Sequence, residues 1–69
     1  MKEKEINKLN TYISNIEQLG ADARYYSDYE KWEHVETLMY SILTWAKKGQ
    51  KTCQKIIQER NKEENEKES

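Results

Sequence analysis

The chain has 69 residues, of which 35% are hydrophobic and 36% are charged, and its formal net charge is −1. A chain of this length forms one domain at most and buries only about 60% of its unfolded surface, so we expect it to need a disulfide, a metal or association. A single cysteine, Cys53, and a single histidine, His34, exclude an intramolecular disulfide and a Cys/His zinc site. We therefore expect no metal, no cofactor and a protein that associates.

The first residues, MKEKE, are charged and lead into Ile6 among polar neighbours. No apolar signal-peptide core follows, and no run approaches the roughly 18 residues of a membrane span. We expect a soluble, cytoplasmic protein without a membrane partner. The near-neutral charge argues against general DNA coating, because nonspecific affinity comes from many phosphate neutralisations.

Residues 3–19 are predicted to form an amphipathic helix, because apolar residues recur at intervals of three and four. These are Ile6, Leu9, Ile13 and Ile16, with Tyr12 and Leu19 on the same face. Gly20 follows where a left-handed C-cap would lie, so we expect the helix to end there. The alternative is a helix that continues to Tyr25, at a cost of about 1 kcal/mol for an interior glycine.

The stretch DARYYSDYEKW, residues 22–32, holds four of the chain's seven aromatic residues. Ser27 and Glu30 have the spacing of a capping box, which predicts that a second helix starts at residue 27 or 28. The aromatic cluster then marks a corner between two helices. We expect Trp32 to lie in the core, and Tyr25 or Tyr29 to be partly exposed and available to a partner.

The second helix, predicted over residues 28–48, carries most of the core. Its heptad stripe is Trp32, Val35, Met39, Ile42 and Ala46, flanked by Leu38, Leu43 and Trp45. This apolar arc spans roughly 160°, wider than the roughly 100° that one neighbour covers. The sequence therefore predicts two neighbours for this helix, and a homodimer or higher oligomer.

Ala46-Lys47-Lys48-Gly49 is typical of a helix end, which favours a third helix over residues 52–60. However, the heptad spacing continues through Cys53 and Ile56, so a hairpin with one very long second helix is also compatible with it. The predicted fold is all-α: a small helical bundle, or a helical hairpin with a C-terminal helical segment, in one domain over residues 1–60. Residues 61–69 lack apolar side chains and are predicted to form a charged, frayed or disordered tail.

An enzyme is not expected, because no catalytic site assembles from these residues. His34 and Cys53 are more than two heptads apart, Glu30, Glu33 and Glu36 repeat at surface spacing, and two glycines cannot make a phosphate loop. Cys53 on the heptad stripe is typical of a small core residue.

Two kinds of binding protein remain, and a structural homo-oligomerisation module is a third possibility. The first is a protein-binding inhibitor that occupies a partner's surface through Arg24, Tyr25, Tyr26, Tyr29, Glu33 and Tyr40. The second is an oligomeric sponge that holds a nucleotide or a short nucleic acid, with phosphates bound by Lys47, Lys48, Lys51 and Lys55. These lysines fall in a segment, residues 45–58, that contains no acid.

The sequence is rich in Lys, Glu, Asn, Ile and Tyr, a composition that fits an AT-rich genome, such as that of a low-GC bacterium or its phage. In size and helical organisation only, the chain resembles phage-encoded inhibitors of host or defence proteins, including anti-CRISPR proteins, and the helical cyclic-nucleotide sponges of phages. The resemblance rests on no diagnostic motif and assigns no site residue. It implies a sequestering or blocking activity.

Overall fold

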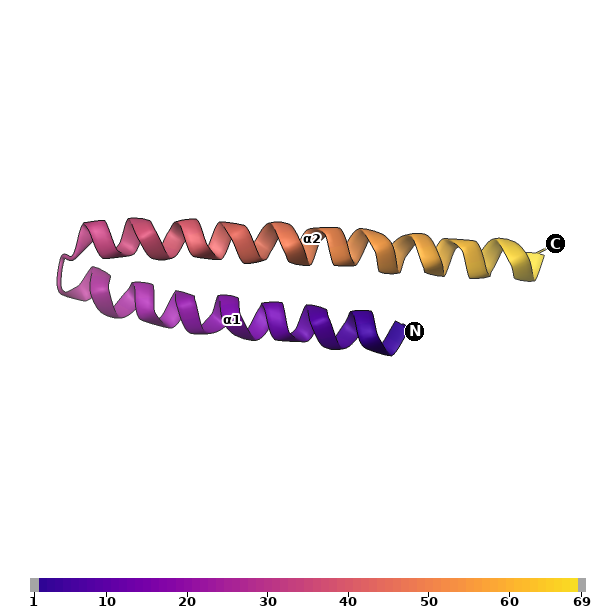
Figure 1. The fold of residues 1–69 in the computed structure, drawn as a ribbon, viewed down its shortest axis with the longest axis horizontal. Coiled ribbons are helices and arrows are strands. Elements are labelled where there is room, and N and C mark those ends of the chain that lie inside the picture. Colours follow the sequence, from indigo (N-terminus) through magenta and orange to yellow (C-terminus); the bar gives the residue numbers. More distant parts are fainter. Residues whose placement is uncertain (1, 69) are drawn as a thin grey trace.

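The computed structural model describes residues 2–68, with the side chains of residues 3–63. The chain forms two α-helices, α1 over Lys2–Asp28 and α2 over Trp32–Glu68, which pack side by side in opposite directions (Figure 1). The described residues include no strand. The all-α prediction is confirmed, in its hairpin form. The hairpin is a rod of 58 × 16 × 13 Å, in which α2 extends beyond the start of α1 (Figure 1).

Both helices are longer than predicted. α1 passes through Gly20 and α2 passes through Gly49, and neither glycine has a positive φ, so neither forms a C-cap. The bounds 3–19, 28–48 and 52–60 are therefore wrong, and the continuous alternatives are found instead. α2 also stays helical over residues 61–68, where we expected a frayed or disordered tail; Ser69 lies outside the described residues. The physical reason is that no proline interrupts the helical spacing anywhere in the chain.

The chain reverses direction over residues 29–31. The amide of Lys31 donates to the carbonyl of Tyr26 at 2.9 Å, and the amide of Glu30 donates to the carbonyl of Ser27 at 3.0 Å. This pair of bonds is a Schellman motif, in which Glu30 takes the left-handed position with φ 57°. The predicted capping box is wrong, because Ser27 lies in the last turn of α1 rather than before the first turn of α2.

The side chains between the two helices form what we call the seam. In α1 its residues are Glu5, Leu9, Tyr12, Ile16, Leu19, Ala23 and Tyr26. In α2 its residues are Val35, Leu38, Ile42, Trp45, Gly49, Thr52, Ile56 and Glu59. All of them are buried or half-buried, and they alternate at intervals of three and four, which is the spacing of a two-helix coiled coil.

The middle of the seam pairs large side chains with small ones. The rings of Tyr12 and Trp45 pack with centroids 5.5 Å apart. One turn further along α2, Gly49 is buried, and a Cβ placed on it would lie 3.6 Å from Cδ1 of Leu9. Gly49 therefore serves as a contact surface for α1 rather than as a helix stop.

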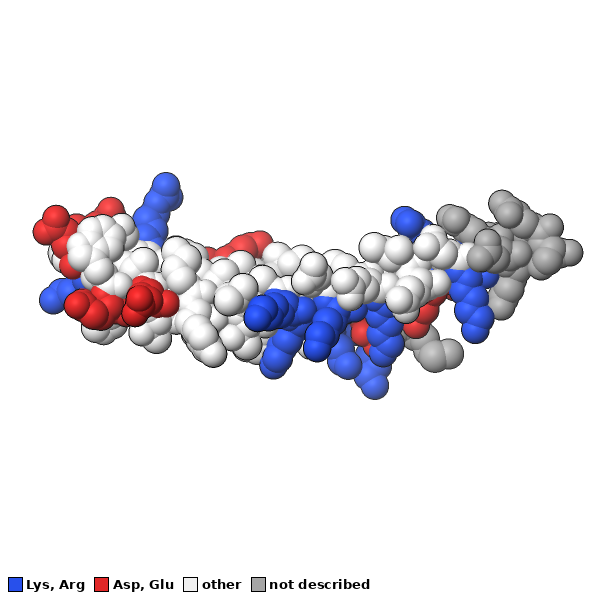
Figure 2. Space-filling model, turned by 90° about the horizontal axis from the view of Figure 1, so that it is seen from above, with Lys and Arg blue, Asp and Glu red and all other residues white. Residues whose placement is uncertain are grey.

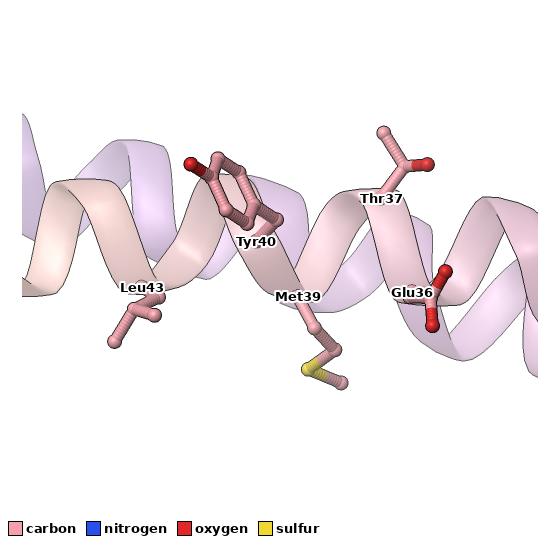
Figure 3. A pocket seen from close by; sticks show the side chains of 5 residues that line it. All are labelled: Glu36, Thr37, Met39, Tyr40 and Leu43. Atoms are coloured by element: carbon pink, nitrogen blue, oxygen red, sulfur yellow. The ribbon is translucent and has the colours of Figure 1, made fainter.

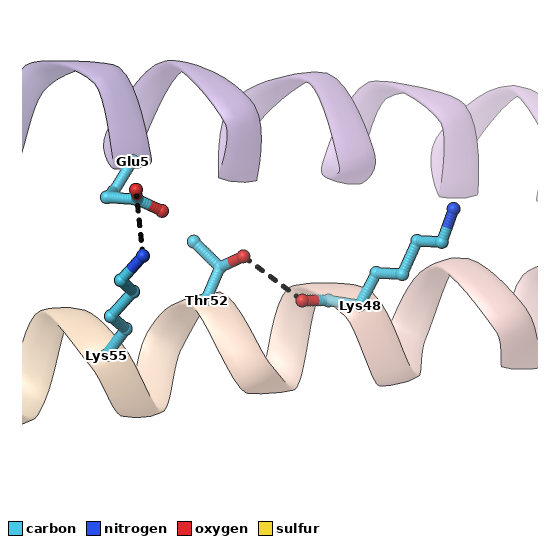
Figure 4. A network of polar contacts seen from close by, with 4 residues as sticks. All are labelled: Glu5, Lys48, Thr52 and Lys55. Carbon is cyan, nitrogen blue, oxygen red and sulfur yellow. Dashed lines mark hydrogen bonds and ion pairs between the residues drawn. The ribbon is translucent and has the colours of Figure 1, made fainter.

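The open end of the seam is polar (Figure 4). The Lys55 ammonium lies 3.5 Å from a carboxylate oxygen of Glu5, whose side chain is mostly buried. The buried Thr52 hydroxyl donates to the carbonyl of Lys48 at 3.1 Å. Such a bond lets a threonine occupy a helix contact without an unpaired polar group. The apolar part of the hairpin therefore lies nearer the turn.

Only two of the five residues in the predicted stripe of α2 face α1. Val35 and Ile42 lie in the seam, whereas Trp32, Met39 and Ala46 are exposed. Their places in the seam are taken by residues that we predicted to flank the stripe, including Leu38 and Trp45. α2 carries two overlapping heptad stripes, and the one with Trp45 and Gly49 matches the shape of α1.

The same shift occurs in α1. Leu9 and Ile16 lie in the seam as predicted, but Ile6 and Ile13 are more than two-fifths exposed. Tyr12 and Leu19, which were expected only to widen the face, are seam residues.

Candidate binding surfaces

Six large apolar side chains lie exposed on one flank of the hairpin, and we call them the outer stripe. They are Ile6 and Ile13 of α1 and Trp32, Met39, Leu43 and Ile57 of α2. Five of them directly follow a seam residue in the sequence, and the sixth, Trp32, lies one heptad before Met39. Two antiparallel helices joined by one seam are related by a two-fold axis normal to the hairpin plane, which keeps equivalent positions on one flank.

A shallow groove follows the outer stripe along α2 (Figure 3). It is lined by Glu36, Thr37, Met39, Tyr40 and Leu43. Met39 and Leu43 are about half exposed and project to the same side of α2, whereas Thr37 projects to the opposite side. Sequence reasoning placed Met39 and Leu43 in or beside the core. The sequence does contain a signal that distinguishes these two residues from the core. It is a second heptad spacing through Leu38 and Trp45, which lies beside the predicted one.

Three tyrosines at the turn, Tyr25 and Tyr26 at the end of α1 and Tyr29 just after it, contact one another in a chain. The rings of Tyr25 and Tyr29 have centroids 4.9 Å apart, and those of Tyr25 and Tyr26 are 5.4 Å apart. Tyr26 is half-buried and stacks on the His34 ring at 4.9 Å. Tyr25 and Tyr29 are 58% and 62% exposed, as predicted, whereas Trp32, expected in the core, is 58% exposed. The cluster is therefore only partly a packed corner.

The other predicted partner-binding residues are dispersed. Glu33 lies near the cluster, because it lines a second groove together with Tyr26 and His34. Tyr40, which is 74% exposed, follows eight residues after the start of α2, about 12 Å along the helix axis. Arg24 is exposed, and its helical position places it on the flank of the outer stripe.

Lysine side chains gather along one edge of the hairpin over its middle, and carboxylates gather at the turn (Figure 2). The predicted phosphate-binding residues Lys47, Lys48, Lys51 and Lys55 are all exposed. The last three have heptad positions on the flank opposite the outer stripe. The ammonium of Lys48 lies 4.8 Å from the ring centroid of Trp45, in a cation–π contact.

Two kinds of site are absent from the described residues. No three His, Cys, Asp or Glu side chains gather in them closely enough to hold a metal ion. Neither α1 nor α2, over the part that the structure describes, is long and apolar enough to cross a membrane. No protein family, curated protein or solved structure matches the chain.

Proposed function

We propose that the chain is a non-enzymatic protein-binding module that acts by occupying a surface of its partner, as an inhibitor of a host or defence protein does. One observation carries the proposal: the exposed rings of Tyr25 and Tyr29 touch each other beside a hydrogen-bonded turn. Tyrosine, tryptophan and arginine dominate interface hot spots, and tyrosine loses little conformational entropy on binding.

The surroundings of the two rings favour a partner with a basic rim. The carboxylates of Asp28, Glu30 and Glu33 lie in or next to the turn and are exposed. Charges at the edge of an interface accelerate encounter and select partners of opposite sign. The Schellman bonds fix the backbone under the rings, so the surface is ordered before the partner arrives.

The test uses three forms of the chain as baits in a bacterial lysate: the wild type, the Tyr25→Ala/Tyr29→Ala double variant and Tyr40→Ala. Tyr40 is the matched control, because it is a similarly exposed tyrosine distant from the turn. A protein retained by the wild type and Tyr40→Ala, but lost from the double variant, is the expected result. For that protein we expect each single truncation to cost at least about 1 kcal/mol of binding. Identical captures by all three baits would contradict the proposal.

Polyanion binding is a second candidate, favoured by the gathering of lysines on one edge of the hairpin (Figure 2). An oligonucleotide of about 20 bases, labelled with a fluorophore, is the probe. Binding through several lysines should weaken steeply between about 50 and 200 mM salt, and should be lost in a variant with Lys47, Lys48, Lys51 and Lys55 changed to Gln. Binding without salt dependence would count against this candidate.

The proposal includes self-association of the chain. Self-association could support the binding of a partner, or it could itself be the activity, as in a structural homo-oligomerisation module. The support is that, in the part of the chain with described side chains, no large apolar side chain is fully buried. A hairpin with so little interior gains stability from a second surface.

A further inference from the structure

We infer that the outer stripe is the interface with a second copy of this chain, and that the two hairpins pack antiparallel to form a four-helix bundle. The inference deepens the proposed self-association, on which it rests, by assigning its surface and orientation. It uses a different surface from the tyrosines of the turn, so the two proposals fail separately.

The first argument is area. The hairpin exposes 5923 Å², whereas a compact protein of its mass, 8.3 kDa, exposes about 4,600 Å². Its radius of gyration is 16.6 Å, against about 11 Å for a compact domain of this length. The excess of about 1,300 Å² exceeds the roughly 800 Å² that each partner buries in a standard interface. One copy therefore has enough surplus surface for a stable dimer.

The second argument is continuity of the apolar flank. Both helices contribute to the outer stripe, so the flank is a two-helix surface, as each half of a four-helix bundle requires. Small residues lie between its large ones: a Cβ added at Gly20 would meet no atom within 4 Å, and Ala46 is exposed. Small residues let two helix pairs approach closely, while Met39 and Leu43 project from the same flank.

The third argument is charge. The part of the chain around the turn, residues 22–36, holds five acids and two bases, whereas residues 45–58 of α2 hold four lysines and no acid. Figure 2 shows the two signs in different parts of the rod. An antiparallel pair places the two acidic turns at opposite ends of the bundle. A parallel pair places like charges together, which is unfavourable.

The interface is tested with neighbouring substitutions that differ only in the flank they occupy. Leu43 lies on the outer stripe, and Thr44, also exposed, lies on the opposite side of α2. In sedimentation at about 1–100 μM we expect a dimer for the wild type and for Thr44→Lys. Leu43→Lys should be a monomer across this range, with at least a tenfold weaker dimer, and should retain the helical circular dichroism of the wild type.

Three results would overturn the interface. They are a wild-type monomer at the highest concentration, a dimer that Leu43→Lys leaves unchanged, and a dimer that Thr44→Lys disrupts equally. Should Leu43→Lys prove unfolded, Met39→Lys takes its place, and Thr44→Lys remains the control.

The orientation is tested by oxidative cross-linking. With a two-fold axis near Ala46, the two Cys53 residues lie about 21 Å apart along the bundle, too far for a disulfide, which needs Cα atoms within about 7 Å. Mild oxidation should therefore leave the wild type uncross-linked and should cross-link the Ala46→Cys/Cys53→Ser variant. Efficient cross-linking of the wild type through Cys53, or no cross-linking of the Ala46→Cys/Cys53→Ser variant, would overturn the assigned orientation.

Discussion

The seam and the outer stripe use the same kinds of residue and differ in what covers them. Each has a tryptophan on α2: Trp45 packs on Tyr12, whereas Trp32 is 58% exposed. Each also has a glycine, with Gly49 buried against α1 and Gly20 in open space. The comparison shows that a heptad pattern specifies a face for helix contact, while the chain's own second helix covers only one such face.

The two tryptophans give the largest expected contrast. Trp45→Ala removes a ring from the seam and should lower the free energy of unfolding by about 3 kcal/mol, as truncation of a buried aromatic does. In the monomeric Leu43→Lys background, Trp32→Ala should cost less than about 1 kcal/mol, because its ring is already largely solvated in the single hairpin. Urea unfolding followed by circular dichroism measures both. Equal losses would show that the two stripes are covered to the same extent.

The two glycines give the next contrast. Gly49→Leu forces a large side chain against Leu9 and should destabilise the hairpin by about 1–3 kcal/mol. Gly20→Leu meets no neighbouring atom in the hairpin and should stabilise it by up to about 1 kcal/mol through helix propensity. Thermal unfolding of both variants in the monomeric Leu43→Lys background separates them. A stabilised Gly49→Leu variant would mean that α1 is not held against Gly49.

The turn that joins the two helices holds one residue in a strained backbone conformation. Glu30 has φ 57°, a conformation that costs a non-glycine residue about 1 kcal/mol or more. Glu30→Gly should therefore raise the free energy of unfolding by about 1 kcal/mol, or the melting temperature by about 4–8 °C. The control is Ala21→Gly in the exposed interior of α1, which should lose a similar amount. A loss of stability in both variants would exclude strain at Glu30.

The smallest contrast comes from two threonines with the same local bond. The hydroxyls of Thr52 and Thr44 each donate to a backbone carbonyl four residues earlier at 3.1 Å. Thr52→Val replaces the hydroxyl in the seam by a methyl group and should stabilise the hairpin by several tenths of a kcal/mol, whereas Thr44→Val should change stability by less than about 0.3 kcal/mol. Chemical denaturation curves with shared slopes resolve this difference. A larger gain at Thr44 would contradict the assigned seam.

The all-α fold follows from composition and from the three-and-four spacing of apolar residues. The helix bounds were harder to predict from the sequence, because Gly20 and Gly49 have the sequence context of C-caps but lie inside helices. The actual C-cap uses Glu30, a residue type with no preference for the left-handed region. Propensity alone therefore points to the wrong positions, and the continuous seam overrides it.

The candidate surfaces were predictable in part. Exposed tyrosines at residues 25 and 29 follow from their charged neighbours. The outer stripe could not be predicted from the sequence, because two heptad stripes overlap on α2 and their apolar content is similar. The choice between them depends on how Leu9 and Tyr12 of α1 fit Gly49 and Trp45, which is a matter of shape rather than hydrophobicity.

The polar open end of the seam has a kinetic consequence. Glu5, Thr52 and Glu59 replace apolar contacts there, so separating the helices at that end exposes little apolar surface. Local opening should therefore begin at the open end and proceed toward the turn. Native-state hydrogen exchange should show amides near Leu19 and Leu38, the seam residues closer to the turn, protected longest, with protection falling toward Glu5 and Ile56. The hairpin thus behaves as a zipper with its fixed end at the turn, where Tyr25 and Tyr29 lie.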